Sequence, residues 1–277
     1  MPDVETAKMA CMEVWGGNRS TWSHFVVPGL DLWVYSQPFG EADQGGDVYY
    51  VSSCASGRIT RLLLGDVSGH GTEASPLARR LREIMRRNIN YIDQTRLVES
   101  LNDQFEAASA TGRFATAVIS TYFAPSRTLT VCIAGHPPPL IFRASTGLWQ
   151  PLQTDGKTDL RNMPIGVLDE QQFSSTQLTL SPGDMILEYT DALFEAFNKE
   201  GTLLKAEGIA ALANSLNAES PGDFVPALLR EIQNLDPRNL TSDDVSVMLA
   251  RANEKGIPMK NNLLAPFRII GGLFTGD

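Results

Sequence analysis

The sequence predicts an α+β fold in which antiparallel β-sheets are covered by pairs of helices, giving a layered sandwich. Three observations lead to this prediction. Stretches that alternate apolar and polar residues with a period of two come in runs, as the strands of antiparallel sheets do. Stretches with helical spacing come in consecutive pairs between these runs. Strands and helices do not alternate one by one, which disfavours the βαβ units of a parallel sheet.

Period-two alternation predicts the first three strands. They cover Leu30–Gln37, residues 47–55 and residues 58–67, with a Ser-Gly turn between the second and the third. The residues before them, 1–27, show no clear period and are predicted to form an N-terminal lead-in segment.

The pattern then changes to helical spacing. Large apolar residues recur at intervals of three to five positions, first between residues 77 and 89 and then between residues 97 and 105. This spacing predicts two consecutive helices, at residues 72–90 and 95–109, each with one apolar face. The residues of these faces are Leu77, Leu81, Ile84, Ile89, Leu97, Leu101 and Phe105.

A second run of strands and a second pair of helices complete the pattern. Five strands are predicted at residues 114–123, 128–134, 139–143, 173–180 and 185–190. Two helices follow, the second opening at Ser220-Pro221-Gly222-Asp223 in the manner of a capping box, and a last strand is predicted at residues 245–251. One domain over residues 28–252 accounts for all these elements, and residues 253–277 form a C-terminal tail.

Composition is that of an ordinary globular protein. The 277 residues are 43% hydrophobic and 20% charged, which is enough for one large core. The formal net charge is −9, so binding to the phosphate backbone of nucleic acid has no electrostatic support. Three scattered cysteines fit a reducing cytosol better than a disulfide framework or a thiolate metal site. Without a signal-peptide pattern or an apolar run of about 18 residues, a cytoplasmic protein with no membrane span is expected.

Acidic residues stand at the ends of several predicted strands, each beside a glycine or a turn. Asp47 opens one strand, Asp66 and Asp191 each follow an apolar run, and Asp243 and Asp244 immediately precede the last strand. A buried carboxylate is costly unless its charge is compensated, and several at one rim would raise one another's pKa. Divalent cations would compensate them. An all-oxygen ligand set without a His or Cys cluster favours Mg²⁺ or Mn²⁺ over Zn²⁺.

A pair of such cations suits phosphoryl chemistry. Two ions about 3.5–4 Å apart hold a water, lower its pKa and bind the phosphoryl oxygens for in-line attack. The glycines of Gly65-Asp66-Val67-Ser68-Gly69-His70-Gly71 allow a tight turn, so the carbonyl of Val67 could be a further ligand. A single aspartate at a strand end is more often a turn former or a helix cap than a metal ligand. The metal hypothesis therefore depends on the aspartates taken together, and is strongest for Asp66.

Four motifs in this order resemble the SpoIIE-like, bacterial sigma-regulatory branch of the protein phosphatase 2C (PPM-type) superfamily. The similarity runs from about residue 30 to residue 251, and the segments Ala134-Gly135-His136-Pro137-Pro138-Pro139-Leu140, Met163-Pro164-Ile165-Gly166 and Ser181-Pro182-Gly183-Asp184 agree with it. The four motifs are Gly45-Gly46-Asp47-Val48-Tyr49, the Gly65–Gly71 segment given above, Tyr189-Thr190-Asp191 and Asp243-Asp244-Val245-Ser246-Val247.

The resemblance implies a four-layer α-β-β-α sandwich with two divalent cations, Mn²⁺ or Mg²⁺, at one end of the two sheets. By motif position Asp47 and Asp66 would be the catalytic metal ligands, with Asp66 bridging the two ions. The Val67 carbonyl would be a backbone ligand, and Asp191 and Asp243 would hold the second ion. Phosphatases of this kind act on phosphoserine or phosphothreonine of a regulatory protein of the anti-anti-sigma type. Activation by a separate protein, by the lead-in segment or by homodimerisation through the helix pair at residues 72–109 is a further hypothesis.

Two positions depart from the family pattern. The family usually has aspartate where this chain has Tyr50, and glycine where it has Ala192. All the predicted ligands are present, so we expect an active protein serine/threonine phosphatase. The alternative is a catalytically weakened phosphatase fold that serves as a binding module in a partner-switching system. Both departures, Tyr50 and the Cβ of Ala192 beside a predicted metal ligand, leave room for that alternative.

Overall fold

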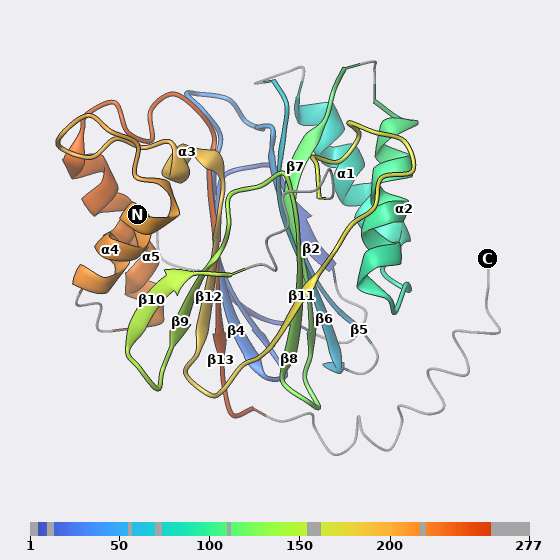
Figure 1. The fold of residues 1–277 in the computed structure, drawn as a ribbon, viewed down its shortest axis with the longest axis horizontal. Helices are drawn as coiled ribbons and strands as arrows, with labels where there is room; N and C mark the ends of the chain where they lie inside the picture. The colour runs from blue at the N-terminus through green and yellow to red at the C-terminus, as the bar shows by residue number, and fades with distance from the viewer. Residues whose placement is uncertain are drawn as a thin grey trace.

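Two β-sheets stack face to face, and helices cover both outer faces, so the layers run helix, sheet, sheet, helix (Figure 1). This arrangement confirms the predicted α+β sandwich. The computed structural model describes residues 5–9, 14–54, 57–69, 74–109, 112–153, 162–216 and 220–255.

The first sheet contains the last strand of the fold near its centre. Its strands are β1 (Glu5–Lys8), β3 (Thr21–Val27), β4 (Leu30–Gln37), β9 (Leu140–Arg143), β10 (Leu148–Pro151), β12 (Met185–Tyr189) and β13 (Val245–Ala252). Over the described ranges their order is β1-β3-β4-β13-β12-β9-β10. Neighbours are antiparallel except β1 and β3, which run parallel.

The second sheet is antiparallel throughout its described strands. These are β2 (Val14–Gly17), β5 (Asp47–Cys54), β6 (Ile59–Val67), β7 (Ala115–Phe123), β8 (Thr128–Ala134) and β11 (Thr176–Thr179). Their order is β11-β8-β7-β6-β5-β2. The two longest strands, β6 and β7, lie at the centre and pair along their whole length.

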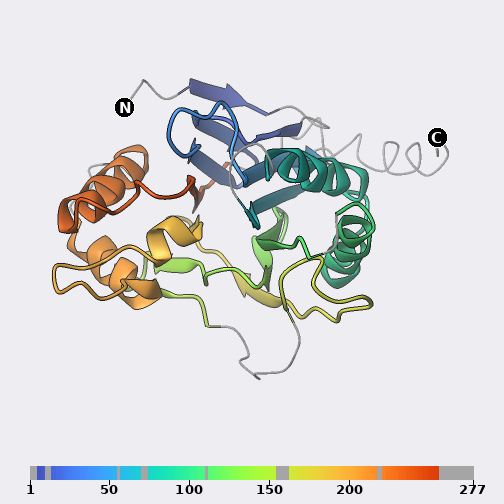
Figure 2. The same ribbon diagram turned by 90° about the horizontal axis from the view of Figure 1, so that it is seen from above.

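Each sheet has its own helical cover (Figures 1 and 2). Helices α1 (Ser75–Arg87) and α2 (Gln94–Glu106) cover the second sheet, and α3 (Asp191–Phe194), α4 (Lys205–Ser215) and α5 (Pro221–Leu235) cover the first. Side-chain caps fix the starts of α2 and α5. The Asp93 side chain accepts a 2.9 Å hydrogen bond from the amide of Arg96 in the first turn of α2, and the Ser220 side chain accepts one from the amide of Asp223 in the first turn of α5. No helix in the described residues is long and apolar enough to cross a membrane.

Three apolar clusters join the layers, and strand alternation decides which residue enters which cluster. On β5, Tyr49 and Val51 join the cluster between the two sheets, whereas Val48 and Tyr50 join the cluster under α1 and α2. A third cluster lies between the first sheet and α3, α4 and α5. An inter-sheet face and a helix-covered face can therefore be told apart for every central strand.

Sequence analysis missed several elements. Before residue 28 it predicted no element, but β1, β2 and β3 are paired within the sheets. The alternation of β3 is present in its burial, but polar Ser23 takes one of the buried positions, so the hydrophobicity pattern is faint. Strand β10 and the one-turn helix α3 are too short to show a period. The predicted tail from residue 256 onward and the predicted helix start at residues 72–73 lie outside the described residues.

A buried arginine fixes the connection between α1 and α2. Arg61 of β6 is 1% exposed. Its guanidinium donates to the backbone carbonyls of Ile89 and Tyr91 and, at 2.8 Å, to the hydroxyl of Thr121. A guanidinium is a rigid fork of donors, so these bonds hold the helix pair in one position over the sheet.

Candidate metal centre

Asp47 and Asp66 are neighbours across two paired strands. Asp47 begins β5, and its register partner on β6 is Asp66. Alternation places Asp47 on the same face as Tyr49, and Asp66 on the same face as Leu64, both of which lie in the inter-sheet cluster. The two carboxylates therefore stand at one end of the space between the sheets.

Asp191 and Asp243 come to the same end from the other sheet. Asp191 follows β12 and begins α3, and Asp243 lies two residues before β13, which pairs with β12. Burial first, and then the charges of Asp191, Asp243 and Asp244, raise the pKa of Asp66 to about 7. Burial also raises the pKa of Asp191 to about 6, with Asp243 as the next cause. The structure thus links the four predicted carboxylates through Asp66, which interacts electrostatically with Asp47, Asp191 and Asp243.

Asp47 is the most deeply buried of the four. It is 3% exposed, and burial, followed by the charges of Asp66 and Asp244, raises its pKa well above the usual range. The hydroxyl of Thr190 donates a 2.9 Å hydrogen bond to Oδ2 of Asp47 and partly opposes that shift. Thr190 itself is fully buried. It orients the carboxylate from the facing sheet.

Thr190 belongs to a short polar chain that runs across neighbouring strands of the first sheet. The amide of Ser246 donates to Oγ1 of Thr190 at 3.1 Å, and the hydroxyl of Ser246 donates to that of Ser36 at 2.9 Å. Sequence analysis quoted Thr190 within a motif but gave it no role. The signal available in the sequence was a threonine that directly precedes the predicted ligand Asp191 at the end of a mostly apolar run.

Asp244 shapes the turn that precedes Asp47. Its Oδ1 accepts a 2.6 Å bond from the amide of Phe39, and its Oδ2 accepts from the amides of Gly46 at 2.6 Å and Asp47 at 3.2 Å. Three backbone donors on one buried carboxylate form a strong anchor. Sequence analysis noted Asp244 only as the neighbour of Asp243, because the donors come from about 200 positions earlier in the chain.

Close approach explains the two glycines of this turn. A Cβ at Gly45 would lie 2.3 Å from Oδ2 of Asp244, which no real contact tolerates. A Cβ at Gly46 would lie 3.0 Å from the carbonyl oxygen of Val67. The Val67 carbonyl therefore borders the turn that carries Asp47, next to the carboxylates. Its role as a backbone ligand stays a prediction.

The segment after Asp66 is held by Arg113. The guanidinium of Arg113 donates at 2.9 Å to the carbonyl of Ser68, and the amide of Phe114 donates at 3.1 Å to the Ser68 hydroxyl. Sequence analysis did not single out Arg113. Residues 70 and 71, the end of the glycine-rich motif, lie outside the described residues.

The donor set fits hard divalent cations. Its members are carboxylates and a carbonyl. Burial and neighbouring carboxylates raise the pKa of Asp47, Asp66 and Asp191, and a bound cation would compensate their negative charge. Among the described residues, no three His, Cys, Asp or Glu side chains lie close enough together to hold a metal ion as they stand. The ligand assignments stay predictions.

A family model decides the relationship. The model for Stage II sporulation protein E (SpoIIE) matches residues 56–253, well over half of the chain. The chain belongs to the SpoIIE family. Its place in the SpoIIE-like branch of the PPM superfamily, inferred from four motifs, is confirmed.

Solved structures agree with this SpoIIE membership. The RsbU and RsbW domains of Rv1364c from Mycobacterium tuberculosis match with a TM-score of 0.67 and 26% identity, over 91% of this chain and 71% of that one. The PP2C phosphatase domain with a regulatory fragment of SpoIIE from Bacillus subtilis matches with a TM-score of 0.63 and 17% identity, over 88% and 64%. RsbX in complex with magnesium matches with a TM-score of 0.59 and 16% identity, over 84% and 100%.

The two departures from the SpoIIE pattern lie in apolar surroundings. Tyr50 is fully buried under α1 and α2, on the face of β5 opposite to that of Asp47. Ala192 lies in α3 and packs against the cluster below α4 and α5. Alanine is the most favourable helix residue, so its Cβ suits this position.

Glu188 is a further buried carboxyl group of this SpoIIE-family domain, and sequence analysis did not single it out. It lies on the inter-sheet face of β12 and is 2% exposed. The hydroxyl of Ser120, from the facing sheet, donates a 2.7 Å bond to Oε1, and Oε2 has no hydrogen-bond partner among the described residues. Burial raises the pKa of Glu188 to about 7.

We expect Glu188→Gln to weaken the pH dependence of the free energy of unfolding. Between the unfolded pKa of 4.5 and the folded pKa of about 7, the folded state keeps a proton that the unfolded state has lost. This contribution is complete below pH 4.5 and is lost as the pH rises through 7, up to about 3 kcal/mol. Urea unfolding of metal-free protein at about pH 5 and pH 8 measures it. The variant should gain stability relative to wild type only at the higher pH.

Glu231→Gln is the matched control, because Glu231 is exposed on α5. Its unfolding free energy should follow that of wild type at both pH values. An equal gain in both variants, or no gain in Glu188→Gln, would contradict the buried-carboxyl explanation.

Proposed function

We propose that this chain is a divalent-metal-dependent serine/threonine phosphoprotein phosphatase that acts on a phosphorylated regulatory partner of the anti-anti-sigma type. One observation carries the proposal. Asp47 and Asp66 are paired across β5 and β6 between the sheets, and the charges of Asp191 and Asp243, from the facing sheet, raise the pKa of Asp66.

In this proposal the chain's residues hold and shape the reaction centre. Asp47, Asp66, Asp191 and Asp243 would hold two Mn²⁺ or Mg²⁺ ions, with Asp66 at the electrostatic centre of the set. When bound, the ions supply a water activated at neutral pH and neutralise charge on the phosphoryl group. The Thr190 hydroxyl keeps the Asp47 carboxylate in position, and Asp244 holds the turn that precedes it.

Electrostatics supports the need for cations. The chain carries a net charge of −9, and its carboxylate cluster would repel a phosphorylated side chain. Divalent ions invert that local field and make the same cluster attractive to phosphate. A fold neighbour solved in complex with magnesium is consistent with that choice. The regulatory partner is inferred from the neighbours that carry RsbU, RsbW and SpoIIE domains.

The test is hydrolysis of para-nitrophenyl phosphate and of phosphopeptides by the purified chain. We expect turnover with Mn²⁺ or Mg²⁺, a fall of at least about 100-fold with EDTA, and recovery when excess Mn²⁺ is added. Phosphoserine and phosphothreonine peptides should be hydrolysed faster than a phosphotyrosine peptide of the same sequence.

Two results would count against the proposal. Turnover that survives EDTA would remove the cations from the mechanism. No turnover of any phosphate ester, by protein that still binds a phosphorylated partner tightly, would favour the alternative of a phosphatase-fold binding module.

A further inference from the structure

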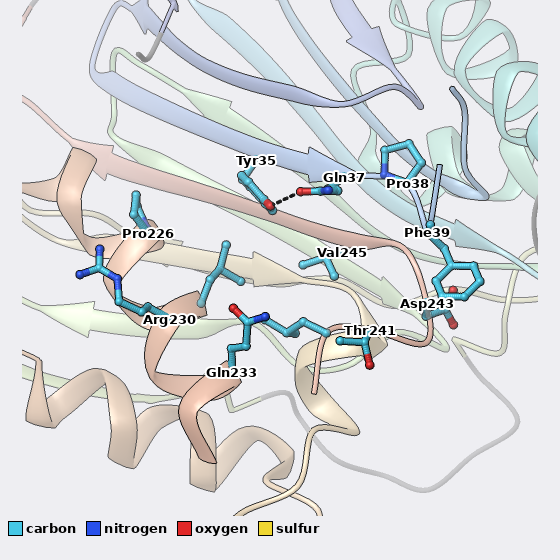
Figure 3. Close-up of a pocket in the computed structure, with 13 residues that line it drawn as sticks. Tyr35, Gln37, Pro38, Phe39, Pro226, Arg230, Gln233, Thr241, Asp243 and Val245 are labelled. Carbon is cyan, nitrogen blue, oxygen red and sulfur yellow. Dashed lines mark hydrogen bonds between the residues drawn. The ribbon is translucent and has the colours of Figure 1, made fainter. Parts of the chain in front are cut away.

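A groove of about 520 Å³ opens beside the candidate metal centre, between the end of β4 and helix α5. Its volume lies in the range of binding sites in proteins. Figure 3 shows its walls: residues from the end of β4 on one side, and residues of α5 on the other.

The groove has opposite charges at its two ends. Figure 3 places Asp243 beside Phe39 at one end and Arg230 beside Pro226 at the other. Of the described lining residues, Arg230 is the one with a positive charge. It is exposed on α5, so its guanidinium is open to a carboxylate from outside.

The groove between these ends suits a polypeptide. Leu229 and Val245 form an apolar floor, and Phe39, 46% exposed, adds an uncovered ring at the rim. Two amides, Gln37 and Gln233, are exposed on opposite walls and offer donors and acceptors to a peptide backbone. Tyr35 donates a 2.7 Å bond to the Gln37 oxygen and orients that amide (Figure 3).

The groove is continuous with the candidate metal centre, and this continuity indicates which molecule binds in it. Asp243 lines the groove and also belongs to the carboxylate set around Asp66. A phosphoryl group bound at the cations would place its own chain beside Asp243, at the mouth of the groove. The residues that flank the phosphorylated side chain would then lie along the groove toward Arg230.

We propose that this groove binds the substrate segment next to the phosphoserine or phosphothreonine, with an apolar side chain over Leu229 and a carboxylate against Arg230. The inference rests on the proposed function, because the phosphoryl group sets the direction of the segment. It makes the preferred substrate an acidic phosphopeptide, despite the net charge of −9 of the enzyme.

The experiment uses two series of phosphoserine peptides in an alanine background, one with Asp and one with Lys moved through each flanking position. We measure kcat/KM with Mn²⁺, and we measure binding of the matching non-hydrolysable phosphonate peptides by fluorescence anisotropy. At one position Asp should be preferred over Lys by about three- to tenfold, as expected for one solvent-exposed ion pair gained and one repulsion avoided. Arg230→Glu should reverse that preference in both measurements.

Arg251→Glu is the matched control, because it makes the same charge change at the opposite end of β13 and Arg251 is exposed. It should keep the wild-type preference. Normal turnover with no Asp preference at any position, or with a preference that survives Arg230→Glu, would overturn the proposed role of the groove. The proposed phosphatase activity would stand. An Arg230-dependent preference in binding, without turnover of any phosphate ester, would support peptide binding in the groove and overturn the proposed phosphatase activity.

Discussion

Replacing Asp66 with asparagine is expected to lower kcat/KM for para-nitrophenyl phosphate by about 10³-fold. Asp66 is the carboxylate whose pKa responds to Asp191, Asp243 and Asp244, and Asp47 responds to it in turn, so it stands at the centre of the set. If Asp66 is a ligand of the proposed ions, its loss removes several kcal/mol of transition-state stabilisation, and about 4 kcal/mol corresponds to that factor. Steady-state kinetics with Mn²⁺ measures the loss of kcat/KM, and calorimetric titration of Mn²⁺ measures the accompanying loss of metal affinity.

The same Asp66→Asn substitution should stabilise the metal-free protein at pH 8. Burial raises the pKa of Asp66 from 3.8 to about 7, so the stability gained from its proton is complete below pH 3.8 and lost as the pH rises through 7. Asparagine carries no charge to desolvate, and the expected gain is on the order of 3 kcal/mol in urea unfolding with EDTA.

Asp169→Asn is the control for both measurements, because Asp169 is exposed in the loop before β11. It should change neither turnover nor stability. If Asp66→Asn turned over substrate at the wild-type rate, or bound Mn²⁺ as tightly, the assignment of Asp66 as the bridging ligand would be wrong.

Replacing Asp244 with alanine is expected to lower the free energy of unfolding by about 3 kcal/mol, because buried donors lose a charged acceptor. The amides of Phe39, Gly46 and Asp47 all donate to this carboxylate, which is 5% exposed. The turn that carries Asp47 would loosen, so affinity for Mn²⁺ should also fall by about tenfold, as it does when residues that orient ligands are removed. Urea unfolding and Mn²⁺ titration measure the two effects.

Asp244→Asn separates lost hydrogen bonding from lost charge. The amide oxygen of asparagine can still accept from the Gly46 and Asp47 amides, whereas its NH₂ group cannot serve the amide of Phe39. We expect a loss of stability between those of wild type and Asp244→Ala. Asp169→Ala controls for removal of an exposed carboxylate. Equal stability of Asp244→Ala and wild type would show that the turn does not depend on this anchor.

The order of the elements could be predicted from the sequence because strand and helix periods are local. The helices at Ser75–Arg87 and Gln94–Glu106 were found within a few residues of their bounds through evenly spaced apolar residues. Strand β3 was missed because Ser23 interrupts its buried face, and α3 because one turn is shorter than a detectable period. Periodicity is lost where polar residues are buried or where an element is brief.

Sequence alone determined the family and the layered fold and predicted the four aspartates as a set, because each depends on residues that stand together in short motifs or repeat at short intervals. Tertiary structure decided what surrounds them. The Thr190 bond to Asp47 spans 143 positions, and the Asp244 bond to Gly46 spans 198. The Ser120 bond to Glu188 and the groove from Asp243 to Arg230 likewise join different elements. Contacts between distant segments leave no local pattern, because their partners meet only when the two sheets stack.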